Sequence, residues 1–504
     1  MNSLDENTPI IVGVGEITHR TKAADDGLEP IELMARAMES AVHDAGAPGL
    51  LEALDSLDVV CEYSWPYTDA PALLNARLGA RPGRSVYGET GGESPVRFIH
   101  EAALRIARGE SHVAAITGAE ARYTVEAAAK AGAALAWHPR DDSVKLVRGT
   151  DICHPVAVKL GAFMPITIYP FYENAALAHW GQTPRQASQE SARLWARYSE
   201  VAAGNPHAWQ RKPFSHEDIE RVDAANRLIA WPYTKHMVAN PMVNMGAAVL
   251  LTSVAHARGL GIDPRRWAYV WGGAAAREPR DYLQRDHYHG AHAQDLVMES
   301  VLAQAGGHAS AFEMLELYSC FPIVPKMARR TLGLAADARM TSTGGLSFFG
   351  APLNNYMTHA AAGLVRSLRN AAPGKTALLY GQGEYVTKHH ALVLGSAPPP
   401  QGLPPEDYSV QAAADARRGE VPPLVLAHTG NAALETFTVS YGRDGSPVQG
   451  IVIARTPEGA RLMAAVPATD TASIKVLTDL DRSPVGCTGA VSSGADGMLN
   501  WSVA

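Results

Sequence analysis

The chain has 504 residues, 46% of them hydrophobic and 19% charged, and its formal net charge is −7. This length and apolar content predict a soluble body of about two to four domains, and the mild negative charge without a basic run excludes a nucleic-acid partner. The four cysteines, Cys61, Cys153, Cys320 and Cys487, have no Cys-x-x-Cys spacing, so we expect neither a metal site nor a disulfide framework.

The beginning of the chain and its longest apolar runs bear on localisation. Residues 1–8 are polar and acidic, unlike the basic and then apolar start of a secretory signal. No apolar run approaches the ~18 residues that a membrane-spanning helix needs. We therefore expect a cytoplasmic protein with no membrane insertion.

One pattern occurs twice along the chain. Met38-Glu39-Ser40, followed by Ala45-Gly46, recurs as Met298-Glu299-Ser300, followed by Ala305-Gly306. After each copy come an apolar strand, a Gly-rich turn, a long Ala-rich helix and another buried strand. Repeats of this length are typical of a duplicated domain. Helices that alternate with continuously apolar strands indicate α/β halves with sheets covered on both faces.

The predicted division of the chain follows from this duplication and from two changes in composition. The region 122–231 is rich in Trp, Tyr and Pro and too long for a connector, so we interpret it as a lid over the first half. Pro-rich segments follow residue 396, and the short alternating strands after them predict a β-barrel of about five or six strands. The predicted parts are an N-terminal half (1–121 and 232–262), a loop or lid region (122–231), a C-terminal half (263–396), a linker (397–423) and a β-barrel-like domain (424–504).

Several short motifs have the order and spacing of a known family. They are Gly92-Glu93-Ser94, Thr117-Gly118-Ala119-Glu120, Asn244-Met245-Gly246-Ala247-Ala248, Glu316-Leu317-Tyr318-Ser319-Cys320-Phe321, and Gly344-Gly345 with Gly350-Ala351-Pro352. They resemble the thiolase superfamily, and with its extra β-domain the chain is similar to bacterial thiolase-like proteins of type 1 with an additional C-terminal domain. The resemblance implies a duplicated α/β fold of five layers, αβαβα, with a small OB-like C-terminal domain. It also implies an acyl-CoA ligand, a homodimer, and no permanently bound cofactor, with coenzyme A present only as part of the substrate.

The chain departs from that family at the standard catalytic positions. Gly92 stands where thiolases carry the nucleophilic cysteine, and Tyr318 and Ala351 stand where they carry histidines. The stretch 380–384, Tyr-Gly-Gln-Gly-Glu, has no thiol where they carry a second cysteine. Acyl transfer through an acyl-cysteine is therefore not supported.

Other polar groups in these motifs can still do chemistry. Tyr318 is a phenol that can act as a general acid or base. His359 and Asn355 share one face of a helix that begins beside the missing second histidine, and Glu93 is a possible proton acceptor at a helix start. These four are the candidate catalytic residues. The candidates for binding the substrate or CoA are Gly92, Ser94, Tyr356, Gly350, Gly381 and Gly383.

Most of these candidates also have a structural alternative. Ser94 before Pro95 is a good helix cap. Tyr318 can be a satisfied core phenol, and His359 a structural residue of an Ala-rich helix. Cys320 is expected to pack in the core, and Lys388-His389-His390 is expected to be a solvated face or a contact to the CoA phosphates.

Two functions remain open. The first is an enzyme that acts on acyl-CoA without an acyl-cysteine, by aldol or retro-aldol cleavage of a carbon–carbon bond. Tyr318 resembles the tyrosines that replace the usual residues in some thiolase-fold steroid side-chain aldolases. The second is a degenerate thiolase that binds an acyl-CoA without turnover or completes a complex, which the loss of the standard catalytic groups favours.

Overall fold

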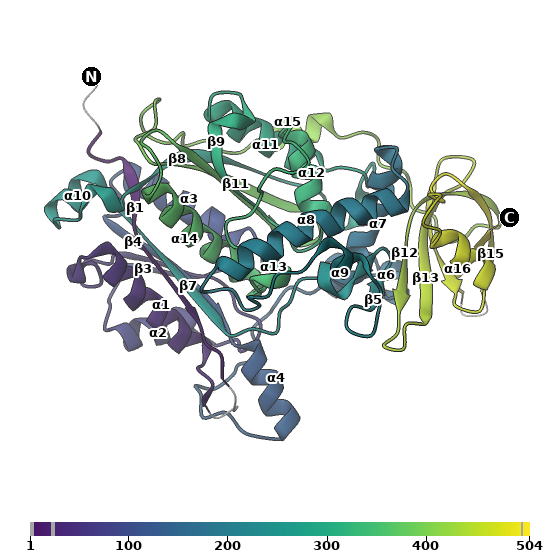
Figure 1. The fold of residues 1–504 in the computed structure, drawn as a ribbon, viewed down its shortest axis with the longest axis horizontal. Helices are drawn as coiled ribbons and strands as arrows, with labels where there is room; N and C mark the ends of the chain where they lie inside the picture. The colour runs from purple at the N-terminus through teal and green to yellow at the C-terminus, as the bar shows by residue number, and fades with distance from the viewer. Residues whose placement is uncertain (1–4, 22–25, 495–496, 504) are drawn as a thin grey trace.

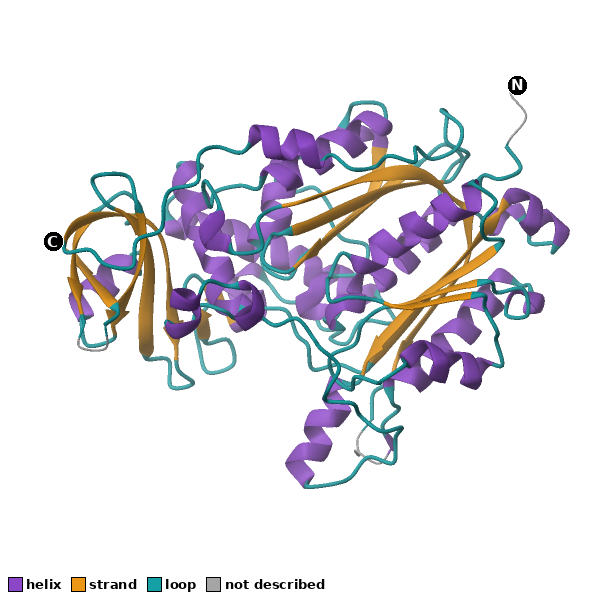
Figure 2. Cartoon of the chain, turned by 180° about the vertical axis from the view of Figure 1, so that it is seen from behind, coloured by secondary structure: helices purple, strands orange, loops and turns teal. Residues whose placement is uncertain are grey.

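The computed structural model describes residues 5–21, 26–494 and 497–503. It has a large α/β body and, at one end, a β-barrel formed by the last part of the chain (Figures 1 and 2). Within these ranges no helix is long and apolar enough to cross a membrane. Residues 1–4, which belong to the polar start considered above, lie outside the described residues.

Nine strands of the α/β body form one continuous sheet. In spatial order they are β3 (Arg84–Tyr87), β2 (Ser56–Val59), β4 (Val113–Glu120), β7 (Met245–Ser253), β1 (Pro9–Thr18), β8 (Ala268–Arg277), β11 (Lys388–Gly395), β10 (Thr376–Gly383) and β9 (Phe312–Leu317). The strands β2–β4–β7–β1 and β9–β10–β11–β8 show the same succession of one parallel and two antiparallel pairings. The two sets meet where Ile10 of β1 pairs with Tyr269 of β8. This repeated order confirms the predicted duplication.

Helices cover the two parts of the sheet in matching ways. The central layer is α3 (Ser94–Ala107) and α14 (Tyr356–Arg369), which pack against each other and against strands of both parts. The outer layers are α1 (Pro30–Ala45) with α2 (Ala70–Leu78) on the first part, and α11 (His292–Gln304) with α12 (Ile323–Thr331) on the second. The two Met-Glu-Ser motifs lie on α1 and α11, which occupy equivalent places. This is the predicted five-layer αβαβα arrangement.

The region 122–231 folds mainly into helices. They are α4 (Arg122–Ala131), α5 (Gly149–Ile152), α6 (Pro155–Lys159), α7 (Pro165–His179), α8 (Pro184–Gly204) and α9 (His216–Glu220). The expected lid over the first half is wrong for α7 and α8, because both pack on the second half. Tyr172 of α7 donates to the carbonyl of Tyr385 (2.9 Å), and Trp195 of α8 donates to the Ser347 hydroxyl (2.9 Å). The aromatic side chains of α7 find aromatic partners there: the ring of Tyr169 stacks on Phe321 at 4.5 Å.

The predicted barrel is present and closed. Its strands are β12 (Gly430–Tyr441), β13 (Pro447–Arg455), β14 (Arg461–Pro467), β15 (Thr488–Ser493) and β16 (Leu499–Val503), paired in the order β12–β13–β14–β16–β15–β12. This is the strand order of an OB-type barrel, with α16 (Thr471–Leu477) as an unpredicted helix between β14 and β15. Two strands of the inserted region, β5 (Leu228–Ala230) and β6 (Tyr233–Thr234), extend its sheet beyond β12.

The barrel and the linker are both attached to the α/β body. Asn174 of α7 donates to the carbonyl of Phe437 in β12 (2.9 Å). The linker contains α15 (Gln411–Arg417), which packs on α11 and β8, and the N–H of Val410 donates to the Ala275 carbonyl (3.0 Å). The segment predicted to be a linker therefore covers the second half. Two short helices, α10 (Val254–Gly259) and α13 (Gly345–Phe348), complete the body.

Candidate functional site

The Gly-rich turn before α3 lies at the centre of the molecule. The chain turns at Gly91 and Gly92, and α3 begins at Ser94 with Glu93 as its N-cap residue. Ser94 does not cap the helix. Its hydroxyl oxygen is buried and has no hydrogen-bond partner among the described residues. The helix-cap alternative for Ser94 is therefore wrong, and a polar atom is left unpaired at the helix start.

Gly92 has no room for a side chain. A Cβ atom on Gly92 would lie 2.5 Å from the Gln382 carbonyl oxygen and 2.6 Å from the Tyr318 hydroxyl oxygen. Both distances are well below van der Waals contact, so even the first carbon of a cysteine would collide with them. The phenol of Tyr318 therefore occupies the space beside the backbone where a nucleophile would otherwise project.

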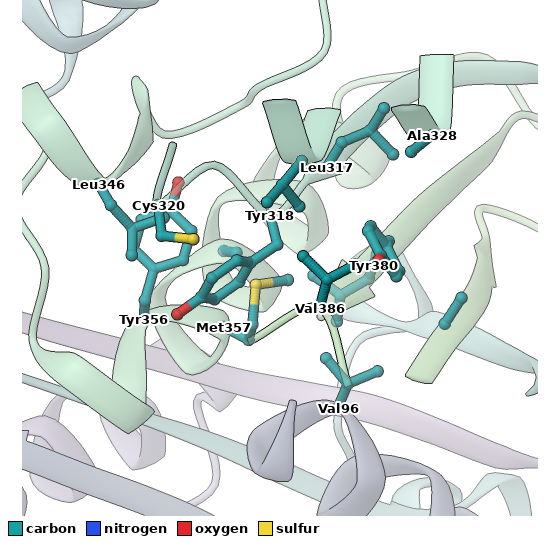
Figure 3. Packing of buried hydrophobic residues seen from close by; sticks show 14 of the residues in the cluster. Val96, Leu317, Tyr318, Cys320, Ala328, Leu346, Tyr356, Met357, Tyr380 and Val386 are labelled. Atoms are coloured by element: carbon teal, nitrogen blue, oxygen red, sulfur yellow. The ribbon is translucent and has the colours of Figure 1, made fainter. Parts of the chain in front are cut away.

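Tyr318 is held in place by the packing of its ring. The residue is 7% exposed, and its ring packs edge-on against Tyr356 at 5.9 Å and lies beside Met357 (Figure 3). Its hydroxyl makes no hydrogen bond to another described residue. Burial, with smaller contributions from Cys320 and Glu93, raises the pKa of Tyr318 well above its ordinary value. Tyr318 therefore stays a protonated phenol that can donate a hydrogen bond.

Glu93 is the acidic group of the turn and is 5% exposed. Its Oε2 atom has no hydrogen-bond partner in the part of the chain that the structure describes. Burial raises the pKa of Glu93, while the positive charge of Lys388 acts in the opposite direction. A Cβ on Gly91 or Gly383 would collide with the Glu93 carboxyl, and a Cβ on Gly381 would lie 3.0 Å from its Cα. The predicted substrate-binding glycines Gly381 and Gly383 thus make room for Glu93.

A cavity of about 340 Å³ opens beside Glu93. Its lining includes Arg97 and Lys388, which are basic, and Tyr408 from the linker. The ammonium of Lys388 donates to the Thr90 carbonyl (2.8 Å) and lies 3.1 Å from the Glu384 carboxylate. A buried carboxyl with an unpaired oxygen and nearby cations is an arrangement that can hold or move a proton.

The segment Lys388-His389-His390 is buried, so its interpretation as a solvated face is wrong. His389 bonds to the Tyr380 hydroxyl (2.7 Å), and His390 bonds to His100 (2.9 Å). Burial lowers the pKa of His389 to about 4 and that of His100 to about 3. The physical reason is that β11 lies inside the sheet, between α3 and α11, where neighbouring strands and helices cover most of its surface.

The equivalent turn of the second half is fully engaged. The Asn354 amide donates to the Cys61 carbonyl (2.9 Å) and accepts from the Gly91 N–H (3.1 Å). The Asn355 amide donates to the Gly118 carbonyl (2.5 Å) and accepts from Thr358 (2.6 Å). Both side chains therefore tie the second half to the first, and each already uses its amide oxygen and one N–H.

His359 is also part of a contact between the halves. It is buried, and its Nδ1 donates to Glu16 of β1 (2.7 Å), which Arg366 contacts as well. Burial alone would raise the pKa of Glu16, but the hydrogen bond and charge of His359, with Arg366, lower it to about 2. The His359 ring packs on Phe349 at 5.3 Å. No contact joins His359 to Gly92 or Tyr318 in the described ranges.

Two predicted binding residues also have other contacts. The Tyr356 hydroxyl donates to the buried Glu316 carboxylate (2.7 Å) and lies 2.6 Å from the Thr343 hydroxyl. Gly350 has a φ of 116°, and a Cβ there would lie 2.9 Å from Val243. Direct contact of Tyr356 or Gly350 with CoA stays a prediction. The described contacts give both residues a role in shaping the loop before α14.

Comparison with known proteins identifies the family. The family model described as thiolase-like protein type 1 additional C-terminal domain matches residues 410–497. A crystal structure of a monomeric SCP2-thiolase like protein type 1 from Mycobacterium smegmatis is 30% identical, with a TM-score of 0.83 over 100% of both chains. The chain belongs to the SCP2-thiolase-like proteins of type 1. No curated protein sequence matches it.

More distant structures share only the fold of this thiolase-like protein. The Ltp2-ChsH2(DUF35) aldolase is 19% identical, with a TM-score of 0.60 over 78% of this chain and 99% of the other. Human mitochondrial 3-ketoacyl-CoA thiolase in complex with CoA is 14% identical, with a TM-score of 0.57 over 78% of this chain and 100% of the other. The predicted thiolase fold is thus confirmed.

The cysteines of this thiolase-like protein are poor nucleophiles. Burial raises the pKa of Cys61, Cys153 and Cys320 to about 12, and it also raises that of Cys487. Because the thiolate is the reactive form, each of these residues stays an unreactive thiol near neutral pH. The Cys320 sulfur lies 3.8 Å from the Gln382 side-chain oxygen, in keeping with core packing.

Sequence reasoning missed two residues that complete the site. The Tyr169 hydroxyl of α7 lies 2.8 Å from the Gln382 side-chain oxygen and 2.9 Å from the Glu384 carbonyl oxygen, and either can accept its hydrogen. Gln382 thereby links α7 to the strand whose carbonyl closes over Gly92. The aromatic run 164–173 is visible in the sequence, but its partner lies more than two hundred residues later. Gln382 between two glycines was the available signal for a close approach of backbone.

Proposed function

We propose that this protein binds an acyl-CoA thioester and cleaves a carbon–carbon bond of its acyl chain in the retro-aldol direction, without an acyl-cysteine. The observation that carries this proposal is the pair at the start of α3. Glu93, next to Gly92, has a buried Oε2 without a hydrogen-bond partner among the described residues, and Gly92 lies against the Tyr318 hydroxyl, which bonds to no described residue. The CoA complex of the human thiolase of the same fold supports a CoA ligand.

The two groups suit opposite roles in this reaction. A raised pKa makes Glu93 a stronger base than an exposed glutamate, so it accepts the proton of a β-hydroxyl group. The bond between Cα and Cβ then breaks, its electron pair forms the thioester enolate, and Cβ becomes a carbonyl carbon. Tyr318, which stays protonated, donates a hydrogen bond to the enolate oxygen. The proton held by Glu93 returns to Cα of the enolate.

A second function is supported by a different observation. Asn354, Asn355 and the Nδ1 of His359 are occupied in joining the two halves, and only the Nε2 of His359 lacks a hydrogen-bond partner among their described contacts. This leaves few free groups around Glu93 and Tyr318. A protein of this kind would bind an acyl-CoA without converting it, or would serve as one part of a complex.

One series of measurements on the wild type and its variants distinguishes the two functions. A β-hydroxyacyl-CoA is incubated with the wild type, Tyr318→Phe and Glu93→Gln, its products are followed by mass spectrometry, and binding is followed by calorimetry. Cleavage that is lost in both variants with binding retained supports the lyase. Binding without cleavage by the wild type supports the non-catalytic binder, and no binding of any CoA compound contradicts both functions. Cys320→Ala is the control and should cleave like the wild type, since no thiolate takes part.

The predicted homodimer stays a prediction. The relative from Mycobacterium smegmatis is monomeric, so resemblance to thiolases in general does not decide the matter. Light scattering of the purified protein decides it: a mass of 53.6 kDa identifies a monomer, and twice that mass a dimer.

A further inference from the structure

A group of histidines lies outside the site described above, in the segment between β8 and α11. Residues 286–292 read Asp-His-Tyr-His-Gly-Ala-His. Asp286, His287 and His292 each offer one ligand atom, and these atoms lie within 4.8 Å of one another. The Nε2 of His292 is 2.8 Å from the Asp286 Oδ2, and the Nε2 of His287 is 3.9 Å from the same oxygen. Three ligands of the two types that zinc accepts here, two imidazoles and one carboxylate, therefore converge on one point.

The spacing fits a metal ion. Zinc bound tetrahedrally at the usual bond lengths needs its ligand atoms about 3.3 Å apart, and the two distances to Oδ2 lie on either side of that value. The side chains of Asp286, His287 and His292 are 12%, 27% and 15% exposed, so an ion has access from solvent. The Nδ1 of His287 is buried and has no hydrogen-bond partner within the described residues. This ring nitrogen is therefore still available to bond a ligand.

The carboxylate is held in place by neighbouring backbone. The N–H of Gly419, in the linker, donates to Oδ2 of Asp286 (2.8 Å), and the N–H of His287 donates to its Oδ1 (2.9 Å). The Asp286 carbonyl accepts from Arg455 (3.2 Å) and Arg461 (3.3 Å) of the barrel. Metal-binding carboxylates are commonly oriented by such outer hydrogen bonds. The ligand set is therefore positioned before any ion arrives.

Two more imidazoles extend the cluster to α7. The His289 ring stacks on His287 with centroids 3.8 Å apart, and on its other side it stacks on His179 at the end of α7, also at 3.8 Å. His289 is thus packed against the face of a ligand ring and holds it in place. The cluster joins the second half, α7, the linker and, through the Asp286 carbonyl, the barrel.

We propose that Asp286, His287 and His292 bind a divalent transition-metal ion of the zinc type. The ion replaces the hydrogen bond between His292 and Asp286 with bonds from both residues to the metal, and it leaves at least one position for water. Because the ligands are contacted from the linker and the barrel, the bound ion stabilises the attachment of the barrel to the α/β body. The sequence has no Cys-x-x-Cys spacing and therefore predicted no metal site. The aspartate and the histidines come together only in the folded chain.

The experiment uses the full chain without a polyhistidine tag, first treated with a chelator. Zinc is added from a buffered solution at micromolar free concentration, and bound metal is measured by elemental mass spectrometry, together with the melting temperature. We expect one zinc per chain and a higher melting temperature. Cobalt(II) gives a second readout, because its visible absorption reports coordination by nitrogen and oxygen ligands.

Variants assign the site. His287→Ala and His292→Ala should each weaken zinc binding by about 100-fold or more, at least as much as losing an outer-shell partner. Asp286→Asn keeps the shape of the side chain and serves if the histidine variants do not fold. His308→Ala, an exposed histidine just after α11, should bind zinc like the wild type. The proposal is overturned if the wild type takes up no zinc, or if Asp286→Asn and His308→Ala bind it equally well.

Discussion

The starts of α3 and α14 are equivalent positions of the duplicated halves, and they have opposite characters. At α3, Glu93 and Ser94 are buried with polar atoms left unpaired among the residues that the structure covers. At α14, Asn354 and Asn355 use their amides on carbonyls of the other half. One copy of the turn therefore holds the halves together, while the other keeps unsatisfied groups whose burial is costly. Unpaired buried groups of this kind are available to bond a ligand.

Two carboxyl groups of the first half show the same contrast in their pKa values. Glu16 and Glu93 are both buried. Burial raises the pKa of both, but His359 and Arg366 overcome this for Glu16, whose pKa lies at about 2, whereas the pKa of Glu93 remains raised. The charged neighbours of each carboxyl group, and not its burial, therefore decide the direction of its pKa shift. Four predictions test this contrast.

The largest effect is expected from Glu16→Gln, which removes the charge between His359 and Arg366. A pKa of about 2 against 4.5 in the unfolded chain corresponds to about 3 kcal/mol of folding free energy at pH 7. Because the pKa is lowered on folding, this stability is present above pH 4.5 and disappears as the pH falls toward 2. Urea unfolding at several pH values measures it. Glu32→Gln, an exposed ion pair with Arg77, should change stability by less than about 1 kcal/mol, and equal effects of the two variants would contradict the contrast.

Asn354→Ala should have the second largest effect. It leaves the Gly91 N–H and the Cys61 carbonyl without partners, which costs about 2 kcal/mol at about 1 kcal/mol for each group. Unfolding by urea checks the value. In the equivalent turn, Ser94→Ala removes a hydroxyl that is already unpaired and should cost nothing or stabilise slightly. If Ser94→Ala proved as costly as Asn354→Ala, the two helix starts would not differ as described.

Gly92→Ala tests the close contact with Tyr318 and Gln382. The added methyl group meets oxygen atoms at 2.5 and 2.6 Å, and such overpacking costs about 1–3 kcal/mol. Tyr318→Phe in the same chain should relieve part of this cost, because it removes one of the two oxygens. Gly49→Ala, which meets nothing within 4 Å, is the matched control. A melting temperature for Gly92→Ala that equals that of Gly49→Ala would show that the site is open.

Glu93→Gln should have the smallest effect and the opposite sign. The pKa of Glu93 is raised on folding, so its ionisation destabilises the folded state as the pH rises above the ordinary glutamate value of 4.5. Glutamine cannot ionise, and the variant should be more stable than the wild type at pH 7 and equal to it below pH 4. Thermal unfolding at both pH values is the measurement. A variant that is less stable at pH 7 would mean that Glu93 has a partner in solution.

The amino-acid sequence by itself determined the duplicated α/β body, the barrel and the loss of the thiolase nucleophile. The spacing of apolar residues and the Gly and Pro residues of turns act over neighbouring residues, so they determine which helices and strands form. The glycine at position 92 can be read directly from the sequence. The strands of the barrel followed from the same local pattern, although α16 and α15 did not.

Only the tertiary structure decided which polar groups meet. His359 shares a helix with Asn355, yet its partner is Glu16, 343 residues away in the sequence. The aromatic side chains of α7 pack on the second half and not on the first. Lys388-His389-His390 is buried because β11 is an inner strand of the sheet. Hydrogen bonds and ion pairs between distant segments depend on how helices and sheets pack, and a sequence pattern that reports local periodicity carries no information about that choice.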